Sequence, residues 1–181
     1  MRGTIYTIGH SNLTAERFFA LLDENAIERL ADVRAFPGSR RHPHFGRELL
    51  DAACREHGVV YQWMPALGGR RRSALVDSPH LAWQEPAFRA YADYADGAEF
   101  GAALAELEAF AAGAARCAFM CAEALWWQCH RRLIADRLVL DGWRVLHVGV
   151  SRTPAEHALP EFARVVAGRV VYDGGTTASL L

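Results

Sequence analysis

Four short polar segments of the chain carry the side-chain types that acid–base catalysis and anion binding require. They are Gly9-His10-Ser11, Asp32-Val33-Arg34, Leu67-Gly68-Gly69-Arg70, and the stretch from Cys121-Ala122-Glu123 to Cys129-His130-Arg131. We expect Glu123 to act as a general acid or base, because a carboxyl group in a partly dry pocket has its pKa raised towards neutrality. His10 is its expected partner in proton transfer. The alternative for Glu123 is a salt bridge to Arg34 or Arg131.

The stretch that begins at Cys129 has the features of an anion site at the start of a helix. Cys129, His130 and Arg131 fall in the first turn of an expected helix, where free backbone N–H groups and the helix dipole favour a negative charge. Arg131 adds a forked donor that suits phosphate or carboxylate. Leu133 and Ile134 follow His130 at helical spacing, so a core position for the His130 ring is the alternative.

Arginine and aromatic residues are mixed in the loop 35–45 and around the arginine run 70–72. This mixture suits a nucleotide or single-stranded nucleic acid, by phosphate pairing and base stacking, and a solvated basic face is the alternative. Within the segments, Asp32 is expected to orient Arg34. The residues expected to bind the substrate are Ser11, Asp32, Arg34, Arg40, Gly68, Gly69, His130 and Arg131.

Two of the four cysteines lie in the last polar segment and permit metal binding. Cys121 and Cys129, together with His10 and His130, are of the types that bind metals. The two thiols are eight positions apart, however, and lack the tight C-x-x-C spacing of zinc sites. We therefore predict no cofactor and no metal ligands, and we keep a divalent metal as a minor alternative.

Cys121 is also a candidate thiolate nucleophile, because it lies at the end of an expected strand, before a loop and a helix start. This setting resembles rhodanese-like and cysteine-phosphatase sites. In those sites the cysteine and the arginine share one short loop, whereas ten positions separate Cys121 from Arg131. Cys54 and Cys117 occupy core-facing positions and are expected to be inert.

The elements that must position these residues alternate between strands and helices. Strands are expected at 4–8, 29–34, 59–63, 117–121 and 143–150, and helices after Thr14, before Gly58, and over about 87–95, 100–112 and 129–141. The alternation predicts a three-layer α/β fold with a mainly parallel sheet of about five strands and helices on both faces. All four polar segments follow carboxyl ends of strands, so we expect them to meet in one crevice.

Length and composition limit the alternatives. The chain has 181 residues, of which 51% are hydrophobic, which predicts a single α/β domain over 1–181. Its motif-bearing core spans about 5–150, with a C-terminal extension over 151–181 that includes a last edge strand at 170–172. The net charge of −1 excludes a strongly basic coat for nucleic acid. No long apolar run and no signal-peptide pattern occur, so we expect a cytoplasmic protein with no membrane contact.

The motifs taken together resemble a known family. They are Thr7-Ile8-Gly9-His10-Ser11, Asp32-Val33-Arg34, Pro37 with Ser39-Arg40, Phe45, Tyr61, Leu67-Gly68-Gly69, Met120-Cys121-Ala122-Glu123, Cys129-His130-Arg131 and His147. In this order they resemble the family catalogued as domain of unknown function 488, over about residues 5–148. The resemblance implies no particular activity. The chain departs from the family at Trp126 and Trp127, where members more often have small or polar residues.

These observations predict an enzyme, a hydrolase or transferase, with a polar crevice at the carboxyl edge of the sheet. Its expected ligand carries phosphate, as a nucleotide or nucleic acid does, and its chemistry is acid–base catalysis by Glu123 and His10. A nucleotide or nucleic-acid binding module without catalysis is the first alternative, and thiolate chemistry at Cys121 is the second.

Overall fold

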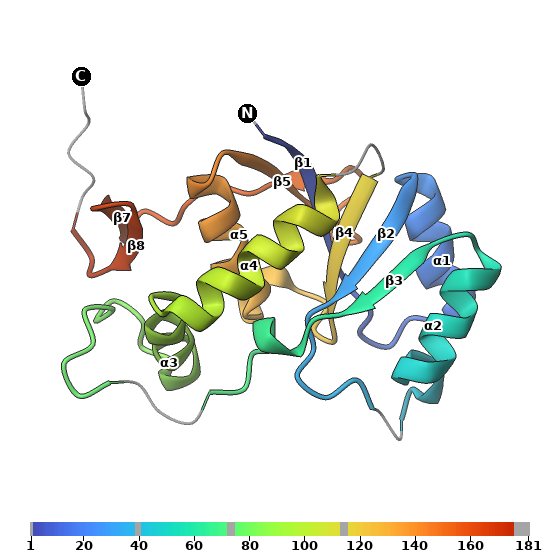
Figure 1. Ribbon diagram of the computed structural model, residues 1–181, viewed down its shortest axis with the longest axis horizontal. Helices are drawn as coiled ribbons and strands as arrows, with labels where there is room; N and C mark the ends of the chain where they lie inside the picture. Colours follow the sequence, from blue (N-terminus) through green and yellow to red (C-terminus); the bar gives the residue numbers. More distant parts are fainter. Residues whose placement is uncertain (1, 39–40, 72–74, 113–115, 176–181) are drawn as a thin grey trace.

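A parallel sheet forms the centre of the protein. The computed structural model describes residues 2–38, 41–71, 75–112 and 116–175. Its main sheet has six strands in the order β3-β2-β4-β1-β5-β6 (Figure 1). Their bounds are β1 Gly3–Gly9, β2 Ile27–Asp32, β3 Val60–Trp63, β4 Arg116–Cys121, β5 Trp143–Val148 and β6 Ala155–Glu156. The first five are parallel, and β6 pairs with β5 in the antiparallel direction.

Helices cover both faces of this sheet. α1 (Ala15–Glu24) and α2 (Arg47–Glu56) pack on one face, in a core built on Phe18, Leu22 and Leu50. The other face is covered by α3 (Pro86–Ala95), α4 (Ala98–Ala111) and α5 (Arg131–Leu140), whose core is centred on Tyr91, Phe100, Leu107 and Leu133. The protein therefore has the three-layer α/β fold that the alternation of elements predicts.

Local sequence signals account for the ends of the elements that lead to the site. The Thr14 hydroxyl accepts a hydrogen bond from the Arg17 amide at 3.2 Å and caps α1, as its position before an apolar stripe predicts. β4 is buried from Cys117 to Cys121 because it lies between β1 and β2 and is covered on both faces. In the register of the sheet, Gly9 lies beside Cys121 and Asp32 beside Met120. Three strands therefore end at the same level.

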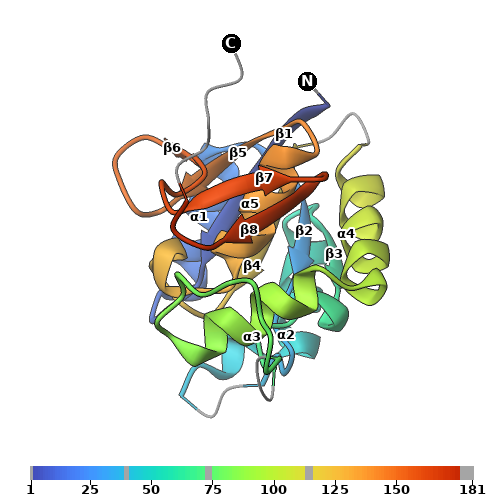
Figure 2. The ribbon, with the colours of Figure 1, turned by 90° about the vertical axis from the view of Figure 1, so that its left-hand side faces the viewer.

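The C-terminal part differs from the predicted edge strand. Val170 and Tyr172 belong to a separate hairpin of β7 (Ala163–Val166) and β8 (Arg169–Tyr172), which lies in front of α5 in Figure 2. The turn residues Ala167 and Gly168 both have positive φ, the geometry that joins two antiparallel strands through a two-residue loop. The edge position of the main sheet is taken by β6 instead.

Within the described ranges, no helix combines the length and the apolar character needed to cross a membrane.

Candidate functional site

Two thiols, an imidazole and a carboxylate meet where β4 ends. Cys121 is the last residue of β4, Glu123 follows it in the loop, Cys129 ends the short 3-10 turn Trp126–Gln128, and His130 directly precedes α5. One side-chain atom from each of these four residues lies within 4.8 Å of the others. We call Cys121, Glu123, Cys129 and His130 the thiol–histidine cluster.

Within the cluster, the two thiols share one hydrogen-bond acceptor. The Cys121 and Cys129 thiols donate to the same Glu123 oxygen, Oε2, at 2.9 and 3.1 Å. His130 Nδ1 lies 3.6 Å from Cys129 Sγ and 3.9 Å from Cys121 Sγ. Both sulfurs therefore have the carboxylate on one side and the imidazole on the other.

A backbone carbonyl orients the His130 ring. His130 Nε2 lies 3.1 Å from the Val33 oxygen, which only accepts hydrogen bonds, so Nε2 carries a proton and donates. In the neutral ring Nδ1 then holds a lone pair, and it faces the two sulfurs. His130 is buried and packs beside Tyr91, so the ring is at once part of the core and part of the cluster.

The start of α5 is directed at Cys129. The Arg131 amide and its Nε each donate to Cys129 Sγ at 3.5 Å. Nη1 of Arg131 donates to Thr7 Oγ1 at 3.0 Å and Nη2 to the Glu123 carbonyl at 2.6 Å, and the side chain is almost fully buried. The helix start that we expected to bind an external anion therefore faces a sulfur of the chain itself.

These contacts separate the two thiols electrostatically. Burial alone would raise the pKa of Cys129, but the hydrogen bond with Cys121 and the positive charge of Arg131 oppose burial, and the pKa of Cys129 is held well below its usual range. The pKa of Cys121 is raised well above its usual range, by its hydrogen bond with Cys129, by burial and by Glu123. Of the two thiols, Cys129 is therefore the more acidic.

Two glycines allow neighbouring loops to approach the cluster closely. A Cβ atom on Gly69 would lie 2.4 Å from His130 Nδ1, and one on Gly9 would lie 1.8 Å from the Glu123 carbonyl oxygen. Gly68 is packed in the same way against Ala35, at 2.7 Å. Any side chain at these positions would displace the site residues, so the glycine motifs are needed for packing around the site.

A second polar group lies at the ends of β2 and β1. Arg34 donates through Nε and Nη2 to both Asp32 oxygens, at 2.8 and 2.6 Å. The Tyr61 hydroxyl donates to Asp32 Oδ2 at 2.7 Å, and Arg34 Nη1 lies 3.3 Å from His10 Nε2. Arg34 thus uses three of the five N–H donors of a guanidinium on the protein, and Asp32 holds its plane in place.

His10 has the contacts of a neutral, positioning imidazole. Burial and the nearby Arg34 charge lower the pKa of His10 to about 4. Its Nδ1 donates to the Ser11 carbonyl at 3.0 Å, and its ring stacks on Phe45 at 4.2 Å between centroids. Ser11, with a φ of 44°, directs its hydroxyl towards Asn12 at 3.5 Å.

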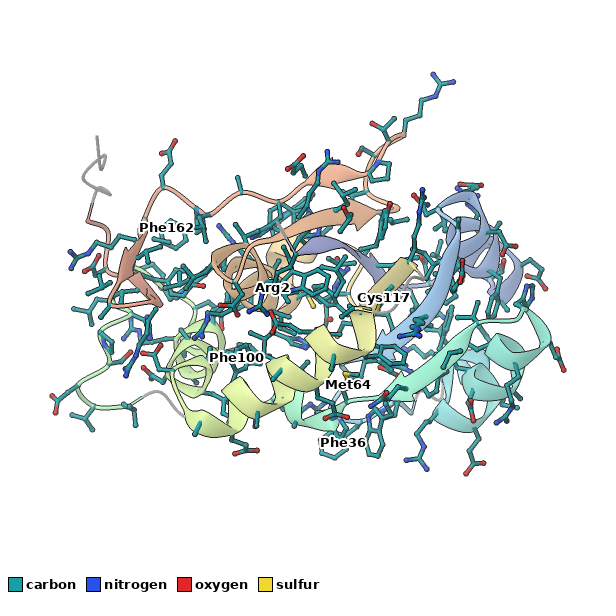
Figure 3. The ribbon with its side chains drawn as sticks, turned by 45° about the horizontal axis from the view of Figure 1, so that its top comes forward. Arg2, Phe36, Met64, Phe100, Cys117 and Phe162 are labelled. Carbon is teal, nitrogen blue, oxygen red and sulfur yellow. The ribbon has the colours of Figure 1, made fainter. Side chains whose placement is uncertain are left out.

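A pocket of about 620 Å³ opens over the cluster. Its polar lining comes from Arg34, Gly69, Arg70, Glu85, Cys121, Glu123, Gln128, Cys129 and His130, and its aromatic lining from Phe36, Phe88 and Trp127. Figure 3 shows Phe36 at the periphery of the molecule, where 72% of its surface is exposed. An adjoining pocket of about 560 Å³ shares Phe36 and extends to Arg47 and Trp63. The two pockets form a continuous aromatic surface around Phe36.

Some of the predicted site residues line this pocket, and others lie behind the lining residues. Glu123, Cys121, Arg34, Gly69 and His130 line the pocket. The residues that do not line it are His10, Ser11, Asp32, Gly68 and Arg131. His10, Asp32 and Arg131 contact lining residues from behind and position them. Arg40 lies outside the described residues.

The spacing of the cysteines did not indicate that Cys129 lies beside Cys121 in the site. The two thiols are eight positions apart, but the loop 122–128 with its 3-10 turn folds back and brings them together. The C-x-x-C spacing rule considers only cysteines that are close in the sequence, so it does not detect such a pair. The presence of two cysteines and a histidine around one loop was the available signal.

A buried chain of hydrogen bonds lies behind Arg131. Thr7 Oγ1 contacts His147 Nδ1 at 3.1 Å, His147 Nε2 contacts His157 Nδ1 at 2.9 Å, and His157 Nε2 donates to Asp136 at 2.8 Å. Burial, with the neighbouring His157, lowers the pKa of His147 to about 3. We call Thr7, His147, His157 and Asp136 the histidine relay. Thr7 and His147 belong to the motifs that resemble the family, but no local pattern identifies the hydrogen bonds that join the four residues.

The comparison with family models assigns the chain to a family. The model described as "Domain of unknown function DUF488" matches residues 14–138, which is more than half of the chain, and the protein belongs to this family. This agrees with the resemblance that the motifs carry. The searches of curated proteins and of solved structures found no match.

Proposed function

We propose that the protein is an enzyme, a hydrolase or transferase, that acts on a nucleotide or on single-stranded nucleic acid in the 620 Å³ pocket. The observation that carries the proposal is the lining: a carboxylate, Glu123, lies in one cavity with two arginines and three aromatic side chains. Arginine pairs with phosphate and aromatic rings stack on bases, so these are the groups that a nucleotide requires.

Each polar group has a separate role in this proposal. Arg70 is exposed, stacks on Phe36 at 5.5 Å, and has no ion pair within the described part of the chain, so its charge is available for a phosphate. Arg34 contributes the two N–H donors that Asp32 and His10 leave unused. Glu123 is the general base or acid in the lining of the pocket, where its side chain is exposed, and His10 positions Arg34.

The aromatic surface supports a ligand longer than one nucleotide. Phe36 belongs to both pockets, and the second pocket adds Trp63, which carries the Arg47 guanidinium at 4.7 Å from its ring centre. A base stacked on each ring would place the intervening phosphate near the arginines. Single-stranded nucleic acid is therefore the favoured form of the ligand.

Binding is tested with a fluorescein-labelled single-stranded oligonucleotide and fluorescence anisotropy. Phe36→Ala and Arg70→Ala should each weaken binding about 5- to 150-fold, the range that corresponds to about 1–3 kcal/mol for a stacked base or a phosphate contact. Arg17→Ala, on α1 and outside the pocket, is the control and should bind like the unmodified protein. Equal affinity of all three variants would contradict the proposed ligand.

Catalysis is tested with Glu123→Gln and mass spectrometry of a mixed oligonucleotide pool. Turnover should fall about 10²- to 10⁴-fold while affinity is retained, because the change removes proton transfer and keeps the shape. Binding by the unmodified protein without any product would favour the binding module. Turnover that survives Glu123→Gln but is lost on alkylation of Cys121 in metal-free protein would favour thiolate chemistry.

A further inference from the structure

We propose that Cys121, Cys129 and His130 bind one divalent transition-metal ion of the zinc class, with Glu123 beside an open fourth position that faces the pocket. The inference concerns the pocket of the proposed function, but metal binding is measured without any substrate. All four residues line the pocket, but the three proposed donors are buried, whereas Glu123 is exposed.

The donor distances fit a tetrahedral ion. With a metal–sulfur distance of about 2.3 Å and a metal–nitrogen distance of about 2.05 Å, tetrahedral angles place sulfur and nitrogen about 3.6 Å apart. The observed separations from His130 Nδ1 are 3.6 Å to Cys129 Sγ and 3.9 Å to Cys121 Sγ. Zinc-class ions prefer this combination of thiolate and imidazole, whereas magnesium and calcium prefer oxygen ligands.

The groups behind the donors have the contacts that support metal ligands. The Val33 carbonyl accepts from His130 Nε2, which leaves the Nδ1 lone pair directed at the two sulfurs. Ligating histidines in general donate their other ring N–H to such an acceptor. Two N–H groups of Arg131 donate to Cys129 Sγ and offset the negative charge of a thiolate.

Glu123 has a different geometry from these three donors. Its Oε2 lies 2.9 and 3.1 Å from the two sulfurs, which is a hydrogen-bonding separation and shorter than the roughly 3.5 Å edge between sulfur and oxygen in a zinc tetrahedron. We therefore place Glu123 next to the fourth position. A water bound there would transfer a proton to the Glu123 carboxylate and leave hydroxide on the ion, which is the reactive oxygen that a hydrolase needs.

The first test uses the purified full chain and Co²⁺ as a spectroscopic substitute for zinc. The expected result is one equivalent of Co²⁺, a sulfur-to-cobalt charge-transfer band and the strong visible absorption of tetrahedral cobalt, all displaced by Zn²⁺. Elemental analysis of the protein as isolated should find zinc. The absence of the charge-transfer band in the unmodified protein would overturn the proposal, and so would octahedral cobalt.

Matched cysteine variants locate the ion. Cys121→Ala and Cys129→Ala should weaken Zn²⁺ binding more than about 100-fold, above the roughly 10- to 100-fold loss of an outer-shell partner. Cys117→Ala removes an equally buried thiol from the same strand and the same face of the sheet, and it should bind Zn²⁺ normally. Equal affinity of Cys117→Ala and Cys129→Ala would overturn the assignment. Far-UV circular dichroism verifies that each variant is folded.

Glu123→Gln separates this inference from the proposed function. The variant should retain the cobalt spectrum and Zn²⁺ affinity within about 10-fold, the lower limit for an outer-shell group. Loss of stoichiometric binding in this variant would make Glu123 a ligand and overturn the open position. Metal binding without oligonucleotide binding would remove the nucleic-acid ligand and leave the metal site, and the opposite result would remove the metal site alone.

Discussion

The thiol–histidine cluster and the histidine relay are two polar groups on either side of Arg131, and they are satisfied to different degrees. In the relay every member has a matched partner: Arg131 donates to Thr7, Thr7 to His147, His147 to His157, and His157 to Asp136. Asp136 also accepts from the Tyr172 hydroxyl at 2.7 Å, which connects the β7–β8 hairpin to α5. The relay is closed.

In the thiol–histidine cluster, the electron-pair donors outnumber the groups that can pair with them. Two sulfurs and the Nδ1 lone pair of His130 face one another, and a single carboxylate oxygen accepts both thiol protons. A closed network stabilises the fold, because each removed partner leaves a buried group unpaired. A group with surplus electron pairs beside a pocket is suited to a ligand. We therefore interpret the relay as scaffold and the cluster as site.

The largest expected effect is the loss of Asp136. Asp136→Ala leaves the His157 ring and the Tyr172 hydroxyl without their acceptor in a dry interior, and should lower the free energy of unfolding by about 3 kcal/mol. Asp141→Ala, at the end of the same helix, and Glu123→Gln should each change it by less than about 0.5 kcal/mol. Urea unfolding measures all three. A similar loss for Glu123→Gln would mean that the cluster is also scaffold.

Acid should act on the polar group around Arg34 through His10, and on the histidine relay through His147. The pKa of His10 is lowered from 6.5 to about 4, and that of His147 from 6.5 to about 3. The unfolded chain therefore binds more protons than the folded protein below pH 6.5, so stability falls as the pH falls through that window, by up to about 1.4 kcal/mol per pH unit for each residue.

The His10→Gln and His147→Gln variants measure the contribution of each histidine to this pH dependence. Each should remove one part of the fall in stability, which for His10 is complete near pH 4 and for His147 continues towards pH 3. Unfolding free energies measured across the window give the slopes. A wild-type stability that does not change between pH 6.5 and 4 would contradict the neutral state of both rings.

A smaller effect is expected from filling the space beside His130. Gly69→Ala places a Cβ atom 2.4 Å from Nδ1, which should cost about 1–3 kcal/mol and disturb the cluster. Gly101→Ala in the exposed part of α4 meets no atom within 4 Å and should stabilise the protein by about 0.5–1 kcal/mol. Thermal unfolding measures both changes, and a neutral Gly69→Ala would show that the loop 67–70 moves freely.

The smallest effect is expected at the support of Arg34. Tyr61→Phe removes one hydrogen bond of 2.7 Å to Asp32 and leaves the two bonds from Arg34 in place, so it should cost about 1 kcal/mol. Urea unfolding gives this difference. A larger loss, comparable with that of Asp136→Ala, would place Asp32 and Arg34 with the closed networks.

Local patterns were sufficient for the order of strands and helices as far as β5, and for the edge at which the polar segments lie. The apolar run of β4, the Thr14 cap and the family motifs are each readable within a few residues, because they depend on backbone periodicity and on hydrogen bonds between near neighbours. The same patterns indicated Glu123, Cys121, Arg34 and His130, all of which line the pocket.

The roles within that edge depended on side-chain directions, which the tertiary structure alone decides. Successive residues after a strand project to opposite faces, so His10 turns towards Phe45 while Gly9 packs on Glu123. The folding of loop 122–128 brought Cys129 to Cys121, and a turn with positive φ made the predicted edge strand at 170–172 half of a hairpin. Contacts between residues distant in sequence, such as His147 with His157 and His130 with Val33, arise only when the layers pack.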